Sequence, residues 1–134
     1  MRTRILLGAL LLVGIVPVAS IATTGGEAAT PAKWAVVNLS EPTLIAGAFA
    51  FGPVLFEHDN ARMARGEACT RVYHFVPGKG PGEEIVSFHC TPRWGATVET
   101  FQLGTRRNDR DTCVLVDYQF AGDPEAHGVP APGR

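Results

Sequence analysis

The middle of the chain holds two runs rich in β-branched and aromatic residues, separated by a segment dense in turn formers. The runs are residues 69–76 (CTRVYHFV) and 84–90 (EIVSFHC), and the separating segment is residues 77–83 (PGKGPGE). β-Branched and aromatic side chains fit a pleated sheet surface, whereas Pro and Gly favour turns. The pattern predicts a β-hairpin with a cysteine near each end.

This hairpin acquires a definite register if Cys69 lies opposite Cys90. Side chains alternate between the two faces of a strand, so the register divides the hairpin into two faces. The mostly apolar face, suited to a core, consists of Cys69, Tyr73, Phe75, Val86, Phe88 and Cys90. We expect the opposite, semi-apolar face to contact a partner unless a second sheet covers it. Its contact residues are Val72, His74, Ile85 and His89.

Further runs with strand-like patterns occur on both sides of the hairpin. They are residues 34–39, 43–51, 54–58, 97–103 and 112–120. Residues 59–66 break the pattern, and we expect one helical turn there, capped by Asp59 or Asn60. About seven short strands without a long helical period predict an all-β fold, a small antiparallel sandwich or a partly open barrel.

The N-terminus has the pattern of a secretory signal peptide. Two arginines among the first four residues precede an uncharged run, residues 5–16, and small residues surround Ser20 and Ala22. This pattern is typical of an exported protein, and cleavage after Ser20 or Ala22 fits it. An uncleaved membrane anchor is the alternative. A spanning helix needs about 20 apolar residues, however, and Pro17 interrupts this run.

Removal of residues 1–22 leaves about 112 residues, which suits one domain. We expect a disordered leader at 23–33, a β domain at 34–120 and an irregular tail at 121–134. The mature chain would carry ten basic and thirteen acidic residues, with no basic stripe and no basic amphipathic helix. Nucleic acid and the membrane surface are therefore not expected partners.

Three cysteines in an exported protein usually mean one disulfide and one remaining thiol. The hairpin brings Cys69 and Cys90 together, so these two are the predicted disulfide. Opposed Cβ atoms in a sheet lie about 4.5–5.5 Å apart, so the pair needs a twisted or non-hydrogen-bonded position. Cys113 is then free, either as a small buried residue or as a link between two chains in a dimer.

Two cysteines and two histidines of the hairpin are side chains of the kind that bind zinc: Cys69, Cys90, His74 and His89. In the predicted register, His89 and Cys90 point to opposite faces, and His74 and His89 lie roughly 13 Å apart. One ion cannot bind both histidines at that distance. No metal ligand and no cofactor are therefore predicted, although a different register would reopen the site.

The sequence contains no G-x-S-x-G, no H-E-x-x-H and no phosphate-binding loop. His58 beside Asp59 is an acid–base pair around which a small secreted hydrolase would be built, but such pairs are common on protein surfaces. No catalytic residue is predicted. Enzymatic activity stays open, and the pattern favours a module without catalysis.

Three further segments form a distinctive set: residues 66–73 (GEACTRVY), 86–92 (VSFHCTP) and 119–130 (QFAGDPEAHGVP). With them, the chain resembles a group of small exported bacterial β-proteins of unknown activity. The resemblance implies a periplasmic or extracellular location and supplies no catalytic residue. We therefore expect an exported binding or structural module with an unknown envelope protein or ligand as its partner. The alternatives are a small His/Asp hydrolase and an envelope metal-binding protein.

Overall fold

The computed structural model describes residues 30–132, and the predicted signal peptide, residues 1–22, lies outside this range. The elements in chain order are β1 (Lys33–Ile45), β2 (Ala48–His58), α1 (Asn60–Ala64), β3 (Thr70–Val76), β4 (Gly80–Phe88), β5 (Thr91–Trp94), β6 (Gln102–Arg107), β7 (Cys113–Gln119) and β8 (Glu125–Gly128). The predicted all-β class is confirmed. In residues 30–132 no helix is long and apolar enough to cross a membrane.

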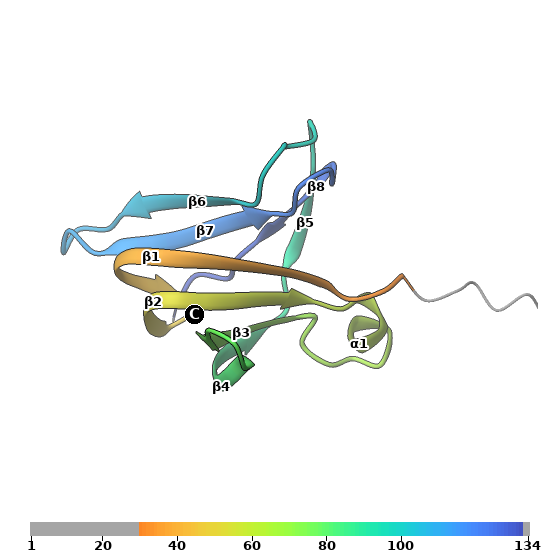
Figure 1. Ribbon diagram of the computed structural model, residues 1–134. Helices are drawn as coiled ribbons and strands as arrows, with labels where there is room; N and C mark the ends of the chain where they lie inside the picture. Colours follow the sequence, from red (N-terminus) through yellow and green to blue (C-terminus); the bar gives the residue numbers. More distant parts are fainter. Residues whose placement is uncertain (1–29, 133–134) are drawn as a thin grey trace, which may run out of the picture.

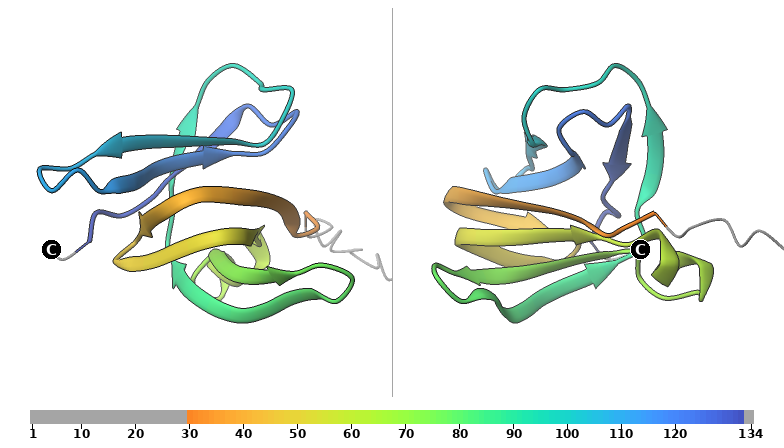
Figure 2. Two further views of the ribbon diagram at one scale, coloured as in Figure 1. Left: turned by 60° about the vertical axis from the view of Figure 1, so that its left-hand side comes forward. Right: turned by 45° about the vertical axis from the view of Figure 1, so that its right-hand side comes forward.

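The strands form one open, mixed sheet in the order β4-β3-β2-β1-β7-β8-β5, and β6 pairs with β7 outside this path. The pairing of β1 with β7 is parallel and joins only Thr43 to Cys113 and Leu44 to Val114. The sheet folds over, so that β6 and β7 lie above β1 and β2 (Figure 1), and two further views show the same layering (Figure 2). Because β4 and β5 are free ends of the described sheet, neither the predicted sandwich nor the predicted barrel is confirmed.

The first two strands are longer than predicted, because prolines expected to end strands occupy irregular positions instead. Pro42 lies where the register of the β1–β2 pair shifts. Pro53 pairs with β1, and the pairing of β2 with β3 begins only at Val54. Both positions tolerate a residue that has no N–H to donate to the ladder. The three strands predicted before residue 59 are thus two, joined at Ala46 and Gly47, where φ is 47° and 92°.

β3 and β4 form the predicted hairpin in a different register. Val72 lies opposite Val86 and Tyr73 opposite Glu84, with irregularities on both sides of Tyr73. The predicted pairing of Tyr73 with Val86 is therefore wrong. A shift of one residue exchanges the two faces of a strand. Val72 is accordingly 0% exposed, whereas the Tyr73 hydroxyl donates to Glu57 Oε2 at 3.1 Å.

The predicted contact face on this hairpin is not formed. Val72 belongs to the hydrophobic core, and Ile85 packs against that core. His74 and His89 are exposed. Because the register shift turns Val72 inward, the four side chains do not share one open surface.

The hydrophobic core lies between the two layers of the folded sheet. β2 and β3 contribute Val54, Phe56 and Val72, and β7 contributes Leu115 and Tyr118. The rings of Phe56 and Tyr118 have centroids 5.2 Å apart. Since the backbone pairing of β1 with β7 is short, burial of these side chains is the main connection between the layers.

The predicted irregular tail, residues 121–134, contains a strand. β8 pairs with β5 on one side and with β7 on the other. It is short and lies among glycines and prolines, so the sequence pattern gives no strand signal there. Lys33 at the start of β1 forms an ion pair with Asp123, and Asp123 accepts a hydrogen bond from the backbone N–H of Glu125 at 3.2 Å. These contacts fix β8 against the rest of the domain.

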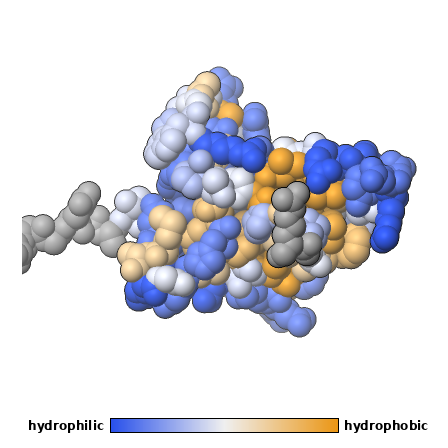
Figure 3. All heavy atoms as spheres, turned by 180° about the vertical axis from the view of Figure 1, so that it is seen from behind, coloured by the Kyte–Doolittle hydropathy of each residue, from blue (hydrophilic) through white to orange (hydrophobic). Residues whose placement is uncertain are grey.

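Some large apolar side chains remain on the surface. From behind, hydrophobic residues gather in one region that is bordered by polar residues (Figure 3). The most exposed large apolar side chains on β1 and β2 are Trp34, Val36, Phe49 and Phe51. The exposed apolar surface of these strands therefore lies outside the predicted contact face of the β3–β4 hairpin.

Candidate metal centre

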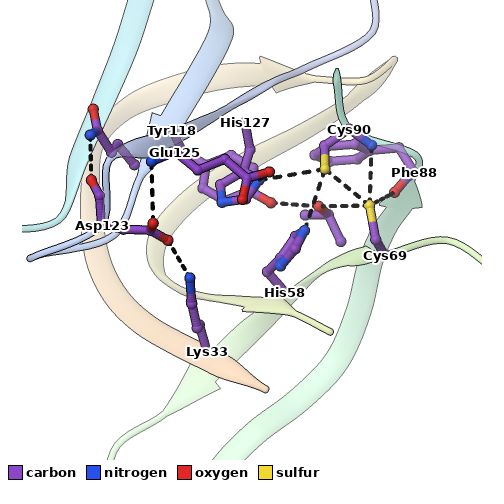
Figure 4. A network of polar contacts seen from close by, with 11 residues as sticks. Lys33, His58, Cys69, Phe88, Cys90, Tyr118, Asp123, Glu125 and His127 are labelled. Atoms are coloured by element: carbon purple, nitrogen blue, oxygen red, sulfur yellow. Dashed lines mark hydrogen bonds and ion pairs between the residues drawn. The ribbon is translucent and has the colours of Figure 1, made fainter. Parts of the chain in front are cut away.

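Four side chains with metal-binding atoms converge where the base of the β3–β4 hairpin meets β8 (Figure 4): His58, Cys69, Cys90 and His127. His58 is the last residue of β2 and pairs with Thr70, so it lies next to Cys69. Cys90 lies between β4 and β5, and β5 pairs with the strand that carries His127. Pairing between neighbouring strands thus brings together donors that are far apart in the sequence.

The donor atoms of three of these side chains, His58, Cys69 and Cys90, all lie within 4.8 Å of one another and are close enough to share one ion. His127 is not a member of this mutually close group and joins it through Cys90. Cys90 Sγ lies 3.4 Å from His58 Nε2 and 3.6 Å from His127 Nδ1. In a tetrahedral site with Zn–S of about 2.3 Å and Zn–N of about 2.0 Å, neighbouring donors are about 3.3–3.8 Å apart. The two distances from Cys90 to the imidazoles already match this spacing.

The predicted cysteine pair is adjacent but not bonded. Cys69 Sγ and Cys90 Sγ are 3.0 Å apart, and both cysteines are free. A disulfide has an S–S distance of about 2.05 Å, and two zinc-bound thiolates lie nearer about 3.8 Å. The predicted proximity is therefore confirmed, whereas the disulfide itself is not at bonding distance. Cys113 is also free and only 8% exposed, and a link between chains through it stays a prediction.

The candidate site is buried and has an aromatic wall. Cys69 and His127 are 0% exposed and His58 is 3% exposed, whereas Cys90 is half-buried. The Tyr118 ring stacks on His127 with centroids 4.9 Å apart, and the two imidazoles are 4.1 Å apart. Within the described residues, His127 Nε2 has no hydrogen-bond partner. The ring nitrogen that faces Cys90 is the other one, Nδ1, so Nδ1 and not Nε2 is the atom available to an ion here.

The two thiols have opposite environments. Cys69 accepts hydrogen bonds, first from the Cys90 side chain and then from His58 and the Cys90 backbone N–H, whose nitrogen is 3.3 Å away. These hydrogen bonds lower the pKa of the Cys69 thiol well below its usual range. The pKa of Cys90 is raised, chiefly by the same contact with Cys69 and secondly by burial of the thiol. The two sulfurs are only 3.0 Å apart, so the acidity of each thiol depends on the protonation of the other.

Burial lowers the pKa of His127 from its ordinary 6.5 to about 4. Desolvation is the largest cause, and the electrostatic influence of His58 and Lys33 acts in the same direction. Asp123 and Cys69 oppose the shift. His127 is therefore neutral near pH 7, the form in which an imidazole binds a metal ion.

This shift predicts that the metal-free protein loses stability in acid. As the pH falls below about 6.5, the unfolded chain takes up the His127 proton first, so stability is full above that pH and declines toward about pH 4. The expected loss is on the order of 2–3 kcal/mol in the free energy of unfolding. Urea unfolding near neutral pH and at about pH 4.5 measures it. His127→Gln should remove most of this difference in stability between the two pH values. The matched control is His74→Gln, because His74 is exposed, and it should keep the difference. Equal pH dependence of stability in the wild type and in His127→Gln would contradict the assignment of the effect to His127.

The structure places the other candidate residues elsewhere. His74 and His89 are exposed and do not belong to the cluster of donors. Asp59 is not the partner of the His58 imidazole. Its Oδ1 accepts a hydrogen bond from the Ala61 backbone N–H at 2.8 Å and caps α1, as predicted. The proposed acid–base pair of a hydrolase is therefore replaced by a contact between His58 and a cysteine.

The sequence patterns identified neither of the two histidines of this site as a metal ligand. His58 is predicted only as half of an acid–base pair with Asp59, and His127 lies in the segment interpreted as an irregular tail. The chain has just four histidines and three cysteines. Considering every histidine with the cysteine pair, without assuming that all ligands share one hairpin, would have included both.

No family model, curated protein or solved structure matches this chain. The resemblance to small exported bacterial β-proteins therefore stays a prediction. The arrangement of the candidate metal centre is therefore the feature of this chain that points to a function.

Proposed function

We propose that this protein is an exported, non-catalytic β domain that binds one zinc ion through four side chains: His58, Cys69, Cys90 and His127. One observation carries the proposal. Two thiols and two imidazoles, delivered by four separate segments of the chain, meet in one buried site. Two cysteines with two histidines are a common ligand set of structural zinc sites.

Charge balance supports a divalent ion. Two thiolates and two neutral imidazoles carry a charge of −2, which a divalent cation neutralises. A neutral complex avoids the large free-energy cost of burying a net charge. Thiolate and imidazole ligands favour zinc or copper over magnesium or calcium, which prefer oxygen.

The position of the ligands supports a structural rather than a catalytic ion. His58 and Cys69 belong to the layer built from β2 and β3, whereas His127 lies on β8, which pairs with β7 and β5. An ion bound here would hold the two layers of the open sheet together in a sandwich-like arrangement. Four protein ligands leave no open coordination position, whereas catalytic zinc keeps one for water.

Export is supported by the N-terminal pattern, in which a basic start, an apolar run and small residues follow one another within residues 1–22. A periplasmic or extracellular location makes the reduction state of the cysteines decisive, because thiols there tend to oxidise. Metal binding is therefore a property of the reduced protein.

The test is the zinc content of untagged protein that has been reduced and kept free of oxygen. We expect native mass spectrometry to show one zinc per chain, bound with the loss of two protons from the thiols. The matched control, His74→Ala with His89→Ala, removes two exposed histidines and should retain the ion. The double variant His58→Ala with His127→Ala should lose the ion. A wild-type protein that binds no zinc would contradict the proposal. A control that loses zinc as readily as this double variant would also contradict it.

A further inference from the structure

We infer that Cys90 and Cys69 form a reactive dithiol that exchanges with small-molecule disulfides, in which Cys90 reacts first and Cys69 then displaces the bound thiol. The exchange itself needs only the two cysteines. Its consequence, release of the metal ion by oxidation, rests on the proposed function.

Unequal access to solvent decides which cysteine reacts first. Cys90 is half-buried and stands between the exposed residues His89 and Thr91. Cys69 is 0% exposed, and its sulfur is surrounded by Thr70, Phe88 and Cys90. Thiol–disulfide exchange needs direct contact between the attacking sulfur and the disulfide, so a dissolved reagent reaches Cys90 and not Cys69.

The distance between the sulfurs makes the second step fast. Cys69 Sγ lies 3.0 Å from Cys90 Sγ, and the Cys90 backbone N–H donates to Cys69 Sγ at 3.3 Å, which holds the two segments together. A nucleophile already held against its target reacts as if it were present at very high concentration. Any thiol that becomes attached to Cys90 is therefore displaced by Cys69 before it accumulates.

The chemistry balances without another reactant. Cys90 releases its proton and attacks as the thiolate one sulfur of a small disulfide R–S–S–R, the S–S bond of the reagent breaks, and the leaving R–S⁻ takes up that proton as R–SH. Cys69 then attacks the Cys90 sulfur, the mixed disulfide breaks, and a second R–SH leaves with the Cys69 proton. The protein loses two electrons and two protons, and the reagent gains both. The product is the Cys69–Cys90 disulfide.

Disulfide formation removes both thiolates from the metal centre. Only the imidazoles of His58 and His127 then remain as ligands, and two neutral nitrogens bind zinc far more weakly than a set containing two thiolates. The same pair of sulfurs is thus either bound to the ion or joined to each other. Oxidation by a small disulfide is expected to release the ion.

The experiment treats reduced, metal-free protein with oxidised glutathione and follows the intact mass. Every variant carries Cys113→Ser, so only the two site cysteines react. With both cysteines present, we expect the mass to fall by two hydrogens, with no lasting adduct. Cys69→Ser should accumulate one glutathione on Cys90. Cys90→Ser should react at least about tenfold more slowly, because Cys69 is buried.

A lasting adduct on the protein with both cysteines, or equal reaction rates of the two single variants, would overturn the inference. Cys69→Ala and Cys90→Ala repeat the comparison, and circular dichroism identifies any variant that is unfolded. Even if all single-cysteine variants unfold, the protein that keeps both Cys69 and Cys90 still tests the inference. Its disulfide must form without a lasting glutathione adduct. A separate arm loads zinc first and follows its release to a chromophoric chelator. If the protein binds no zinc while exchange proceeds as expected, the proposed function fails and the reactive dithiol stands.

Discussion

Replacing Cys90 by serine is expected to lower the zinc affinity of the reduced protein at least about a hundredfold. Cys90 Sγ is the atom in contact with each of the other donors, at 3.0 Å from Cys69, 3.4 Å from His58 and 3.6 Å from His127. Structural zinc sites in small peptides bind with about 10–16 kcal/mol, so one of four ligands contributes on the order of 3 kcal/mol. A serine hydroxyl is not ionised near neutral pH and does not replace a thiolate as a zinc ligand.

Competition between the protein and a chromophoric zinc chelator, under reducing conditions, measures this change. Cys113→Ser is the matched control, since Cys113 lies at the start of β7, opposite Thr43 and Arg107 and outside the cluster of donors. Its zinc affinity should equal that of the wild type. If Cys113→Ser and Cys90→Ser weaken zinc binding equally, the assigned ligand set is wrong.

Phe56→Ala is expected to lower the free energy of unfolding by about 3–5 kcal/mol. Phe56 is 0% exposed, and its ring packs against those of Phe101 and Tyr118, at centroid distances of 5.4 Å and 5.2 Å. Its removal opens a cavity between the two layers, where the backbone pairing of β1 with β7 is short. The surrounding aromatic rings can refill such a cavity only in part.

Urea unfolding of the reduced, metal-free protein measures this loss. Phe51→Ala is the matched control, because Phe51 is the same residue type on the same strand and is 60% exposed. It should change the free energy of unfolding by no more than about 0.5 kcal/mol. A smaller loss for Phe56→Ala than for Phe51→Ala would mean that the core does not lie between β2 and β7.

Local patterns in the sequence were sufficient to predict the class of fold. The hairpin of β3 and β4 follows from β-branched and aromatic runs around a turn, and the Asp59 cap follows from a short polar side chain before a helical turn. The closeness of Cys69 and Cys90 follows from the same hairpin. These features depend on residues that are near one another in the chain.

The register of the hairpin was not predictable in the same way. The pairing is displaced by one residue already at the cysteine end of the hairpin, where Thr70 lies opposite Phe88, so Val72 rather than Tyr73 enters the core. Nothing in the alternation of residues marks this shift, because the energy of a register depends on packing against β2 and the opposite layer. The predicted contact face failed for this reason.

Both histidine ligands were hidden by pairings between strands. The hairpin offers only His74 and His89, which are exposed and lie outside the candidate site. His58 reaches Cys69 because β2 pairs with β3. His127 reaches the site only because β8 pairs with both β5 and β7. Such pairings join segments far apart in the chain, and local sequence patterns carry no information about them.

The most direct test of the account is X-ray absorption at the zinc edge on zinc-loaded, reduced protein. We expect a four-coordinate ion with two sulfur neighbours at about 2.3 Å and two nitrogen neighbours at about 2.0–2.1 Å. His127→Ala should lose one nitrogen neighbour and keep both sulfurs. A wild-type spectrum with only nitrogen and oxygen neighbours would show that the two cysteines do not bind the ion and would contradict the proposed metal centre.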